Sequence, residues 1–363
     1  MRNLTAFLIL LCAFVSQPVD AQDSIAGKPT LPKRVINGVT SVLREFNNID
    51  TAYIEPQHYR FSAMMQSTYM FEWYRIKSKS GQTISFAPET RIKVGPYVSW
   101  SLLLLGYSID LAYISANKKR EIDMSIYSSM IGVDLFYQRS GHDYNIRYVD
   151  LGDDDLRLEE TIPFGGLGVS ITGINVSYVL NHRKFSYPAA FSQSTCQRRS
   201  AGTVILGMGY TRHSLSMDTE RLKNTLEPYD VYPYLDNDLF FNSIDYTDVA
   251  FSGGYAYNWV FSKNWLFNVT LSASLAYKHS TGDYIMDALI FKDFSFSNMN
   301  FDGVGRFGLV WNNSNWFFGA NGVVHSYNYK KPQFATSNYF GNVNLYVGFN
   351  FGRKKGHIHE KHY

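Results

Sequence analysis

The run from Asn342 to Phe351, NVNLYVGFNF, alternates between two kinds of side chain without interruption. One parity, which includes Leu345, holds only apolar side chains, whereas the other, which includes Asn344, holds Asn, Tyr and Gly. Successive side chains of a β-strand point to opposite faces, so the run predicts a strand with one apolar and one polar face. In a soluble sandwich the apolar face would meet a core. In a transmembrane barrel it would meet lipid, with Leu345 in the bilayer and Asn344 in the lumen.

Two upstream segments carry the same alternation and bear on this choice. The row of alternate residues from Trp265 to Tyr277 and the row from Phe301 to Trp311 are apolar or Gly throughout, and both begin and end with an aromatic residue. The other face of the second row carries Asp302 and Arg306, which fit a polar lumen better than a dry core. Aromatic ends fit the two interfacial girdles of a barrel. The pattern therefore favours an all-β, transmembrane antiparallel barrel over a soluble sandwich, which stays as the alternative.

The composition agrees with a strand-rich membrane protein. The chain holds 27 Tyr and 26 Phe, residues typical of strands, and its mean hydropathy is −0.20. Past residue 21, no apolar stretch approaches the roughly 20 residues of a membrane helix, which excludes a helical membrane protein. A barrel escapes hydropathy averaging because its polar residues alternate with its apolar ones.

The net charge of +3 is concentrated in the tail that follows Phe351. That tail holds Arg353, Lys354, Lys355 and Lys361 against Glu360, so the preceding body is balanced. A balanced body does not indicate a nucleic-acid-binding surface. Nucleic acid is therefore not expected as a partner, whereas outer-membrane lipid is.

The N-terminus predicts export. A short positive start is followed by an apolar run from Leu4 to Val15, and a small residue, Ala21, precedes the expected cut. Residues 1–21 are therefore predicted to be a cleaved signal peptide of the Sec type, with an N-terminal membrane anchor as the alternative. Residues 22–58 then form an N-terminal periplasmic segment, in which 35–46 is compatible with a short amphipathic helix.

The barrel is predicted to occupy residues 59–351 and to be followed by a basic, His-containing periplasmic tail at 352–363. The expected strands lie at 59–77, 91–111, 121–137, 166–180, 202–213, 248–261, 264–279, 300–312, 315–329 and 338–351. These are ten, an even number, and a hidden hairpin would make twelve. A parity change across Gly173 predicts a β-bulge there.

The lengths of the connections predict the orientation of the barrel. Only SKN separates Phe261 from Trp265, and only NNSN separates Trp311 from Trp316, whereas the links at 279–298 and 328–337 are longer. Outer-membrane barrels have short periplasmic turns and long external loops, so the C-terminus is expected in the periplasm.

Five segments carry a family resemblance. They are DTAYIEP at 50–56, ISFAPE at 84–89, VGPYVSW at 94–100, IGVDLFYQRSGHDYNIR at 131–147 and FSYPAAFSQSTCQRRSAGT at 185–203. Over nearly the whole mature chain, the sequence resembles the Bacteroidetes outer-membrane protein family labelled domain of unknown function 4421. The resemblance implies a β-barrel in the outer membrane of a Gram-negative bacterium. It implies no activity, and no catalytic or binding residue carries over.

Two groups of residues have the chemistry of metal ligands. His357, His359 and His362 lie in a tail that fixes no geometry, so a solvated tail is favoured over a metal site. The acidic residues at 150–160 include Asp150, Asp153, Asp154, Asp155, Glu159 and Glu160. They lack the spacing of a dedicated calcium loop, so a solvated loop is favoured over calcium binding. No metal and no cofactor is therefore assigned.

Cys196 is the only cysteine of the mature chain, so no internal disulfide is expected. It lies in a polar loop and is interpreted as an unreactive residue. Six predicted strands follow it, which places it on the side of the C-terminus, in the periplasm. This conflicts with the rule of short periplasmic turns, because about twenty residues separate Leu180 from Thr203.

Two classes of function stay open. A structural or interaction barrel has a narrow lumen in which Asp302 and Arg306, about 13 Å apart along one strand, find partners on neighbouring strands. A barrel that admits small solutes is kept as the alternative. An outer-membrane hydrolase acting on lipid or peptide would need His325, beside Asn321, to meet Ser272 or Ser274. Nothing in the spacing brings these residues together, so no catalytic residue is assigned and the protein partner stays open.

Overall fold

The computed structural model describes residues 48–100, 103–106, 109–110, 120–139, 143–152, 157–282, 298–330 and 334–354. The predicted signal peptide, the helix expected at 35–46 and the three His of the tail lie outside these ranges. Within the described ranges, no helix is long and apolar enough to cross a membrane.

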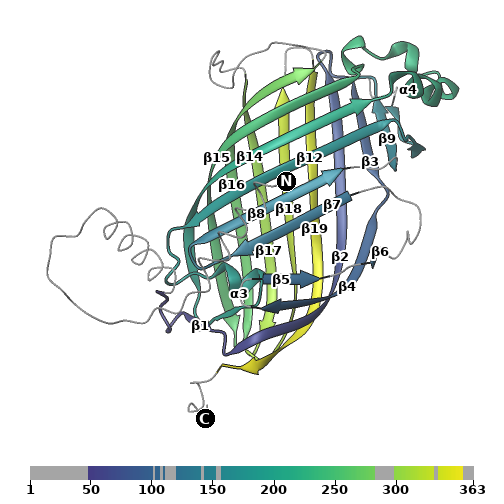
Figure 1. Ribbon diagram of the computed structural model, residues 1–363. Helices are drawn as coiled ribbons and strands as arrows, with labels where there is room; N and C mark the ends of the chain where they lie inside the picture. Colours follow the sequence, from purple (N-terminus) through teal and green to yellow (C-terminus); the bar gives the residue numbers. More distant parts are fainter. Residues whose placement is uncertain are drawn as a thin grey trace, which may run out of the picture. The chain divides into compact units, whose positions relative to one another are not determined.

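The described chain is built mainly from antiparallel strands (Figure 1). The strands are β1 (Ile54–Pro56), β2 (Tyr59–Ser78), β3 (Thr83–Pro88), β4 (Arg91–Trp100), β5 (Leu103–Gly106), β6 (Ile109–Asp110), β7 (Arg120–Tyr127), β8 (Ile131–Arg139), β9 (Tyr144–Asp150), β10 (Arg157–Leu158), β11 (Ile162–Pro163), β12 (Leu167–Val179), β13 (Thr195–Gln197), β14 (Ala201–Met217), β15 (Ser243–Ser262), β16 (Trp265–Gly282), β17 (Met299–Asn312), β18 (Trp316–Lys330) and β19 (Phe334–Arg353). The helices are α3 (Tyr187–Phe191), α4 (Thr219–Leu226) and the 3-10 helices η1 (Glu227–Tyr229), η2 (Tyr232–Tyr234) and η3 (Asn237–Leu239).

The strands close into a barrel, and the last strand completes it by pairing with the first wall strand. β19 pairs with β2 from Phe334 opposite Ser78 to Arg353 opposite Tyr59. In β19, Leu345 is 59% exposed on the outer surface. Its neighbour Asn344 lies inside, where it donates a hydrogen bond to Asn321 Oδ1 at 2.8 Å. The predicted facing of this strand is confirmed, and the fold is a transmembrane antiparallel β-barrel.

The outer surface carries an apolar belt whose height matches a bilayer. On β2 the outward row runs from Phe61 to Trp73 before the basic residues Arg75 and Lys77 begin. A twelve-residue advance at about 3.4 Å per residue, tilted by about 45°, rises roughly 30 Å. Aromatic side chains gather at the lower edge of the belt, where Trp311 stacks on Phe318 with ring centroids 5.1 Å apart. This is the girdle that the aromatic row ends predict.

Two predicted strands are each a hairpin, which corrects the strand assignment. In the segment 91–111, β4 turns back after Trp100, and Leu103 of β5 pairs with it; β6 continues along β4. In the segment 121–137, β7 and β8 pair antiparallel from Tyr127 opposite Gly132. Within the described ranges, and with β5 and β6 taken as one interrupted strand, these two splits raise the ten predicted wall strands to twelve.

The bulge predicted at Gly173 is absent. Its strand, β12, keeps a continuous register with both neighbours, and Gly173 pairs with Thr211 on one side and Phe136 on the other. A Cβ at Gly173 would lie 2.3 Å from the Phe136 ring, so the glycine makes room for an aromatic side chain. The apparent parity change arises because the inward row becomes apolar where it enters a hydrophobic core.

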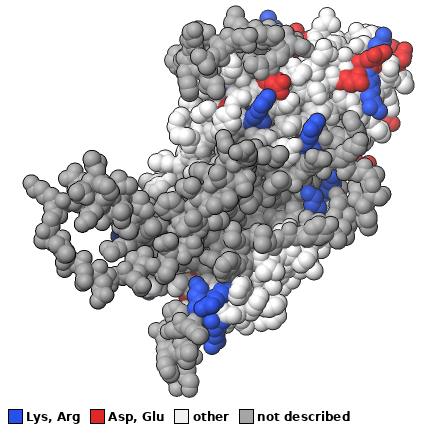
Figure 2. All heavy atoms as spheres, in the orientation of Figure 1, with Lys and Arg blue, Asp and Glu red and all other residues white. Residues whose placement is uncertain are grey.

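One end of the barrel extends into a structure that we call the cap, formed by β3, β9, β10, β11, α4 and η1 to η3. The last residues of β2, from Tyr74, leave β4 and pair with β3, which in turn pairs with β9. In Figure 2, acidic side chains gather at the upper end of the described surface, where Figure 1 shows α4 and β9. The short turns and the end of β19 lie at the opposite end of the barrel.

Candidate functional site

The lumen is closed at the short-turn end by residues 181–200, which we call the plug. Its helix α3 begins after Ser186, whose side chain accepts a hydrogen bond from the Ala189 amide, and has Pro188 in its first turn. Tyr187 is buried, stacks on Tyr127 with ring centroids 5.5 Å apart, and donates to Thr270 Oγ1 at 3.2 Å. The long connection therefore folds inward, which removes the conflict with short turns at this end.

Amide side chains join the plug to the wall. Gln193 donates from Nε2 to Tyr346 Oη at 2.9 Å and accepts from Asn312 Nδ2 at 3.2 Å. Asn258 donates from Nδ2 to the Ser186 carbonyl at 2.9 Å and to Gln197 Oε1 at 3.0 Å. Because buried amides cost free energy when unpaired, these reciprocal bonds fix the plug in one position.

A charged clamp holds the outer side of the plug. β13 pairs with β1, and Arg198, just after β13, pairs with Glu55 of β1. Arg198 also donates to Asn264 Oδ1 at 2.8 Å, and Ser314 donates to Glu55 Oε1 at 3.0 Å. Burial raises the pKa of Glu55, but the charge and hydrogen bond of Arg198, with bonds from Ser314 and His58, bring the net pKa below its ordinary value of 4.5. The Glu55 carboxylate and its partner Arg198 thus join the plug to β1 and to the two turns that hold Asn264 and Ser314.

A buried ionic cluster lies further along the lumen. Lys278 is 0% exposed, and its Nζ lies 2.9 Å from Asp302 Oδ2 and 4.0 Å from Asp248 Oδ2. It also donates to the Asn328 carbonyl at 2.7 Å. His213 Nε2 lies 3.6 Å from Asp248 Oδ2. These residues belong to five consecutive strands, β14 to β18, so the cluster joins the wall across its inner face.

Aromatic rings surround this cluster. The His213 ring stacks on Tyr246 at 4.4 Å, and Tyr246 stacks on Tyr329 at 4.5 Å. Lys278 Nζ lies 5.7 Å from the Tyr246 ring centroid and 5.5 Å from that of Tyr327, within the range of cation–π attraction. The rings displace water from around the ions, so this part of the lumen is packed.

A second ion pair spans the lumen. Arg306 of β17 bonds to Asp134 Oδ2 of β8 at 2.6 Å, and Asp134 also accepts from Ser125 at 2.7 Å and from Tyr127 Oη at 3.2 Å. Asp302 and Arg306 therefore do not pair with each other, as their separation along the strand predicts. Asp302 finds its partner on the adjacent strand, and Arg306 finds its partner across the barrel.

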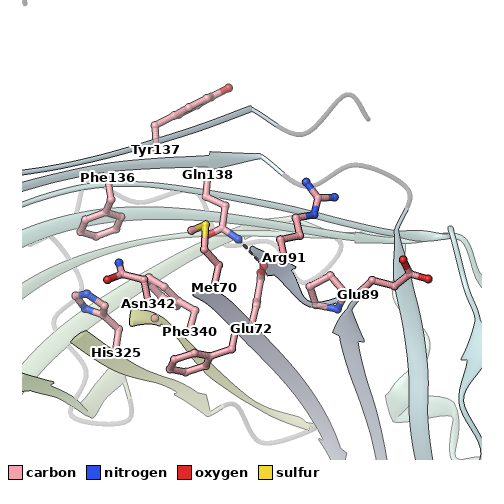
Figure 3. Close-up of a pocket in the computed structure, with 13 residues that line it drawn as sticks. Met70, Glu72, Glu89, Arg91, Phe136, Tyr137, Gln138, His325, Phe340 and Asn342 are labelled. Atoms are coloured by element: carbon pink, nitrogen blue, oxygen red, sulfur yellow. Dashed lines mark hydrogen bonds between the residues drawn. The ribbon is translucent and has the colours of Figure 1, made fainter. Parts of the chain in front are cut away.

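A small pocket lies between β2, β8, β18 and β19 (Figure 3). Glu72 accepts hydrogen bonds from Gln138 and from Tyr144, and Gln138 points into the pocket while its neighbour Tyr137 points away. The volume is about 40 Å³. A cavity of that size holds a few waters at most, whereas ligand pockets measure about 300–1,000 Å³. The pocket does not interrupt the closure of the lumen.

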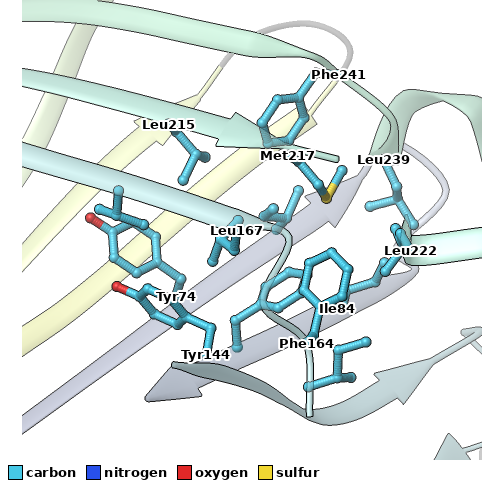
Figure 4. Packing of buried hydrophobic residues seen from close by; sticks show 14 of the residues in the cluster. Tyr74, Ile84, Tyr144, Phe164, Leu167, Leu215, Met217, Leu222, Leu239 and Phe241 are labelled. Atoms are coloured by element: carbon cyan, nitrogen blue, oxygen red, sulfur yellow. The ribbon is translucent and has the colours of Figure 1, made fainter. Parts of the chain in front are cut away.

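The capped end of the lumen is closed by a hydrophobic core (Figure 4). Phe164 and Leu167 come from the connection into β12, Leu215 from β14 and Leu222 from α4, and all four are buried. Each such side chain contributes about 1.5–3 kcal/mol of burial free energy. Plug, ionic clusters and apolar core thus block the lumen at separate levels, and inward side chains between these levels, such as Ser274, Asn321 and Asn344, are only half-buried.

Comparison with known proteins shows the family to which the chain belongs. The profile of the family described as Domain of unknown function (DUF4421) matches residues 48–351. The chain belongs to the DUF4421 family. No curated protein matches the chain.

Three solved structures resemble this DUF4421 chain. They are the outer membrane protease OmpT from Escherichia coli (9% identity, 80% of this chain and 97% of that chain covered, TM-score 0.34), the translocator domain of the autotransporter NalP from Neisseria meningitidis (12%, 88% and 98%, 0.32) and the outer membrane protein OprG from Pseudomonas aeruginosa (8%, 82% and 98%, 0.24). At these identities the similarity concerns the fold alone.

The residues considered for hydrolysis do not meet in this DUF4421 barrel. Ser272 pairs with Val304, and Val304 pairs with His325, so one strand separates the serine from the histidine. At about 4.8 Å per strand spacing, this is roughly 10 Å. His325 is buried and stacks on Phe340 at 4.8 Å. Asn321 bonds to Asn344 instead of His325. The arrangement lacks the contact that a serine nucleophile requires.

The acidic candidates have structural roles where they are described. Asp150 accepts from the Gly152 amide at 2.9 Å, and Glu159 pairs with Arg157 at 3.1 Å. Asp153, Asp154 and Asp155 lie outside the described residues, as do His357, His359 and His362. Glu160 is exposed.

Cys196 lies at the same end of the barrel as the end of β19, which confirms that it shares the side of the C-terminal strand end. It is buried in β13, and burial raises the pKa of its thiol. A raised pKa reduces the thiolate fraction and so its reactivity.

Several lumen residues of this DUF4421 barrel are missed by sequence analysis. Asp248 and Lys278 fall at inward positions of strands that were correctly located, and His213 ends a predicted strand. Charged residues at the inward parity of a transmembrane strand are the available signal. Which of them pair depends on register, and the alternation of one strand does not determine the register between strands.

Proposed function

We propose that this DUF4421 protein is an outer-membrane barrel of a Gram-negative bacterium with an occluded lumen, serving as a structural or interaction component of that membrane. The observation that carries the proposal is the plug, hydrogen-bonded to the wall through Gln193 and Asn258. A lumen that is blocked at several levels offers no continuous path for solutes. The folded structure that this barrel offers to a partner beyond the apolar belt is the cap.

The orientation follows from the connections. The end with short turns and the plug faces the periplasm, and the cap faces outward. This agrees with a signal peptide at 1–21, a periplasmic segment at 22–58 and a periplasmic tail at 352–363. The family resemblance supports a Bacteroidetes source.

The alternatives of the sequence analysis receive less support. A hydrolase lacks a serine and histidine in contact, since Val304 separates Ser272 from His325. A small-solute channel would require displacement of the plug.

Conductance in planar bilayers tests the occluded lumen. The wild-type protein is expected to show no stable channel. Arg198→Ala removes the clamp to Glu55 and is expected to allow brief openings, whereas Arg199→Ala, at the exposed neighbouring position, is expected to stay silent. Large and steady conductance of the wild type would refute the proposal.

Crosslinking tests the interaction role of the cap. A photo-crosslinking side chain in place of Tyr234, which is 62% exposed in the cap, is expected to capture one protein in outer membranes. The same group in place of Leu345, on the belt, is expected to capture lipid. Capture of no protein from the Tyr234 position would favour a purely structural role.

A further inference from the structure

We propose that the outer surface of the barrel holds a lipid with a phosphate headgroup in a groove at the place where β2 passes from β4 to β3. The groove has a volume of about 420 Å³, which lies within the range of ligand sites. Its lining includes Tyr69, Trp73, Arg75, Ser85, Arg147 and Tyr148. Its mouth is on the outer surface, where Tyr69 and Trp73 are exposed, while its inner end shares Met70 and Glu72 with the small pocket of Figure 3.

The groove arises from the change of partner along β2. Along β2, Met70 is the last residue that pairs with β4, and Tyr74 is the next residue that pairs with a strand on this side, namely β3. The two partner strands diverge over the three residues between. β3 contributes small side chains to the outer face, with Ser85 opposite Arg75 on one side and opposite Tyr148 on the other. Small residues between large ones leave a hollow.

Two arginines provide positive charge in the hollow. Arg147 lies at a register shift of β9 and donates to the Pro88 carbonyl at 3.3 Å and to Thr161 Oγ1 at 3.2 Å. A guanidinium has five N–H donors, so these two bonds orient Arg147 and leave further donors. The Arg75 guanidinium lies 5.8 Å from the centroid of the Tyr148 ring. Two carboxylates, Glu72 and Glu89, also line the groove. Glu72 is buried and already accepts hydrogen bonds from Gln138 and Tyr144, so the charges at the mouth are the two arginines against Glu89, an excess of one positive charge.

The other walls are aromatic and continue the apolar belt. Tyr69 and Trp73 face outward on β2, on the same row as Met65. An acyl chain that leaves the groove along this row stays in contact with apolar side chains. A free phosphate ion would gain nothing from these walls, so the lining fits an amphipathic lipid better than an inorganic anion.

The depth of the groove supports the same occupant. Trp73 is the last aromatic residue of the outward row, and Arg75 is the first charged one. Aromatic residues at the end of a belt lie at the level of lipid headgroups. The arginines therefore lie at the height of headgroup phosphates, and each basic residue near such a surface contributes about 1 kcal/mol of attraction, or about fivefold in affinity.

The test uses the full-length protein in detergent micelles and measures lipid binding by native mass spectrometry. Phosphatidic acid is expected to bind, and diacylglycerol with the same acyl chains is expected not to bind. Inorganic phosphate at millimolar concentration is expected not to displace the lipid. Equal binding of both lipids, or full displacement by inorganic phosphate, would overturn the proposal.

Substitutions locate the site. Arg75→Gln with Arg147→Gln is expected to weaken binding of phosphatidic acid at least tenfold. The matched control is Arg212→Gln, which alters an exposed arginine that follows Tyr210 on the outward row of β14, away from the groove. Heat-modifiable gel mobility verifies folding. Unchanged binding by the double variant, or an equal loss in the control, would refute the site.

A single variant keeps the test decisive if the double variant does not assemble. Arg75 is exposed and contacts the described structure through the Tyr148 ring, so Arg75→Gln is expected to fold. It is expected to weaken binding about fivefold. Binding equal to that of the wild type would count against the groove.

Discussion

Cys196 Sγ lies 3.7 Å from Ser314 Oγ, although 118 residues separate the two in sequence. Ser314 belongs to the turn between β17 and β18, so this contact brings the plug to the end of the barrel where the short turns lie. Four strands, β14 to β17, lie between the plug and this turn, an even number, as two segments at the same end require. It also shows that the single described cysteine is covered by a turn.

The first prediction uses Cys196 as a reporter of orientation and burial. An impermeant maleimide is expected to leave it unlabelled on intact cells. After permeabilisation of the outer membrane, labelling is expected to stay slow, because the thiol is buried and its pKa is raised. Rapid labelling is expected only after unfolding. Strong labelling of intact cells would place the short-turn end outside.

The second prediction concerns the depth of the belt. Leu345→Arg places a charge near mid-belt and is expected to destabilise the barrel by about 2–4 kcal/mol. Ser326→Arg, outward on β18 at the level of Tyr339, is expected to cost about 0–1 kcal/mol, since the cost falls toward the interface. Urea titration followed by heat-modifiable mobility measures both. Equal costs would contradict the assigned belt.

The third prediction concerns the buried lysine. Lys278→Met leaves Asp302 and Asp248 buried without their cation and is expected to cost about 3–5 kcal/mol of unfolding free energy. Combination with Asp302→Asn is expected to recover part of the loss. The exposed substitution Lys330→Met serves as control, with an expected change below about 0.5 kcal/mol. Denaturant unfolding supplies the values, and a neutral Lys278→Met would mean that the cluster adds no stability.

The fourth prediction is a pH dependence of the plug. The folded pKa of Glu55 lies below its unfolded value, so its contribution is fully present above about pH 4.5 and is lost as the pH falls through the folded pKa. Hydrogen exchange in residues 181–200 is therefore expected to accelerate below pH 4.5, after correction for intrinsic rates. Glu55→Gln is expected to accelerate exchange at neutral pH and to remove the dependence on Glu55. A wild-type plug with unchanged protection at pH 3 would argue against the clamp.

Alternation predicts the wall well where the outward side chains within the belt are apolar or Gly, as they are in β15 to β19. It fails where a turn has no glycine, proline or asparagine to mark it. The hairpin in which Trp100 pairs with Leu103 falls beside the apolar run SLLLLG, and the hairpin after Tyr127 turns through SSM. Both were therefore interpreted as single strands.

The plug and the cap show a second limit of sequence analysis. The residues around Tyr187 look like a polar loop because their apolar members are few, yet Tyr187, Ala189 and Ala190 are all buried in the lumen. Whether a loop folds into a barrel depends on partners such as Tyr346, which lie far away in sequence. Lumen residues are identifiable by parity and charge, but their pairing requires the register of the whole sheet.

The pairing of β19 with β2 has a consequence for biogenesis. Until its last strand has been delivered, the chain exposes two unpaired strand edges, one on β2 and one on β18, and such edges are templates for aggregation. A chain cut short before Phe334 can never seal itself, however well its earlier hairpins form. Closure of the barrel therefore waits for the last twenty residues of β19, and the order of the strands along the chain makes this the final pairing step.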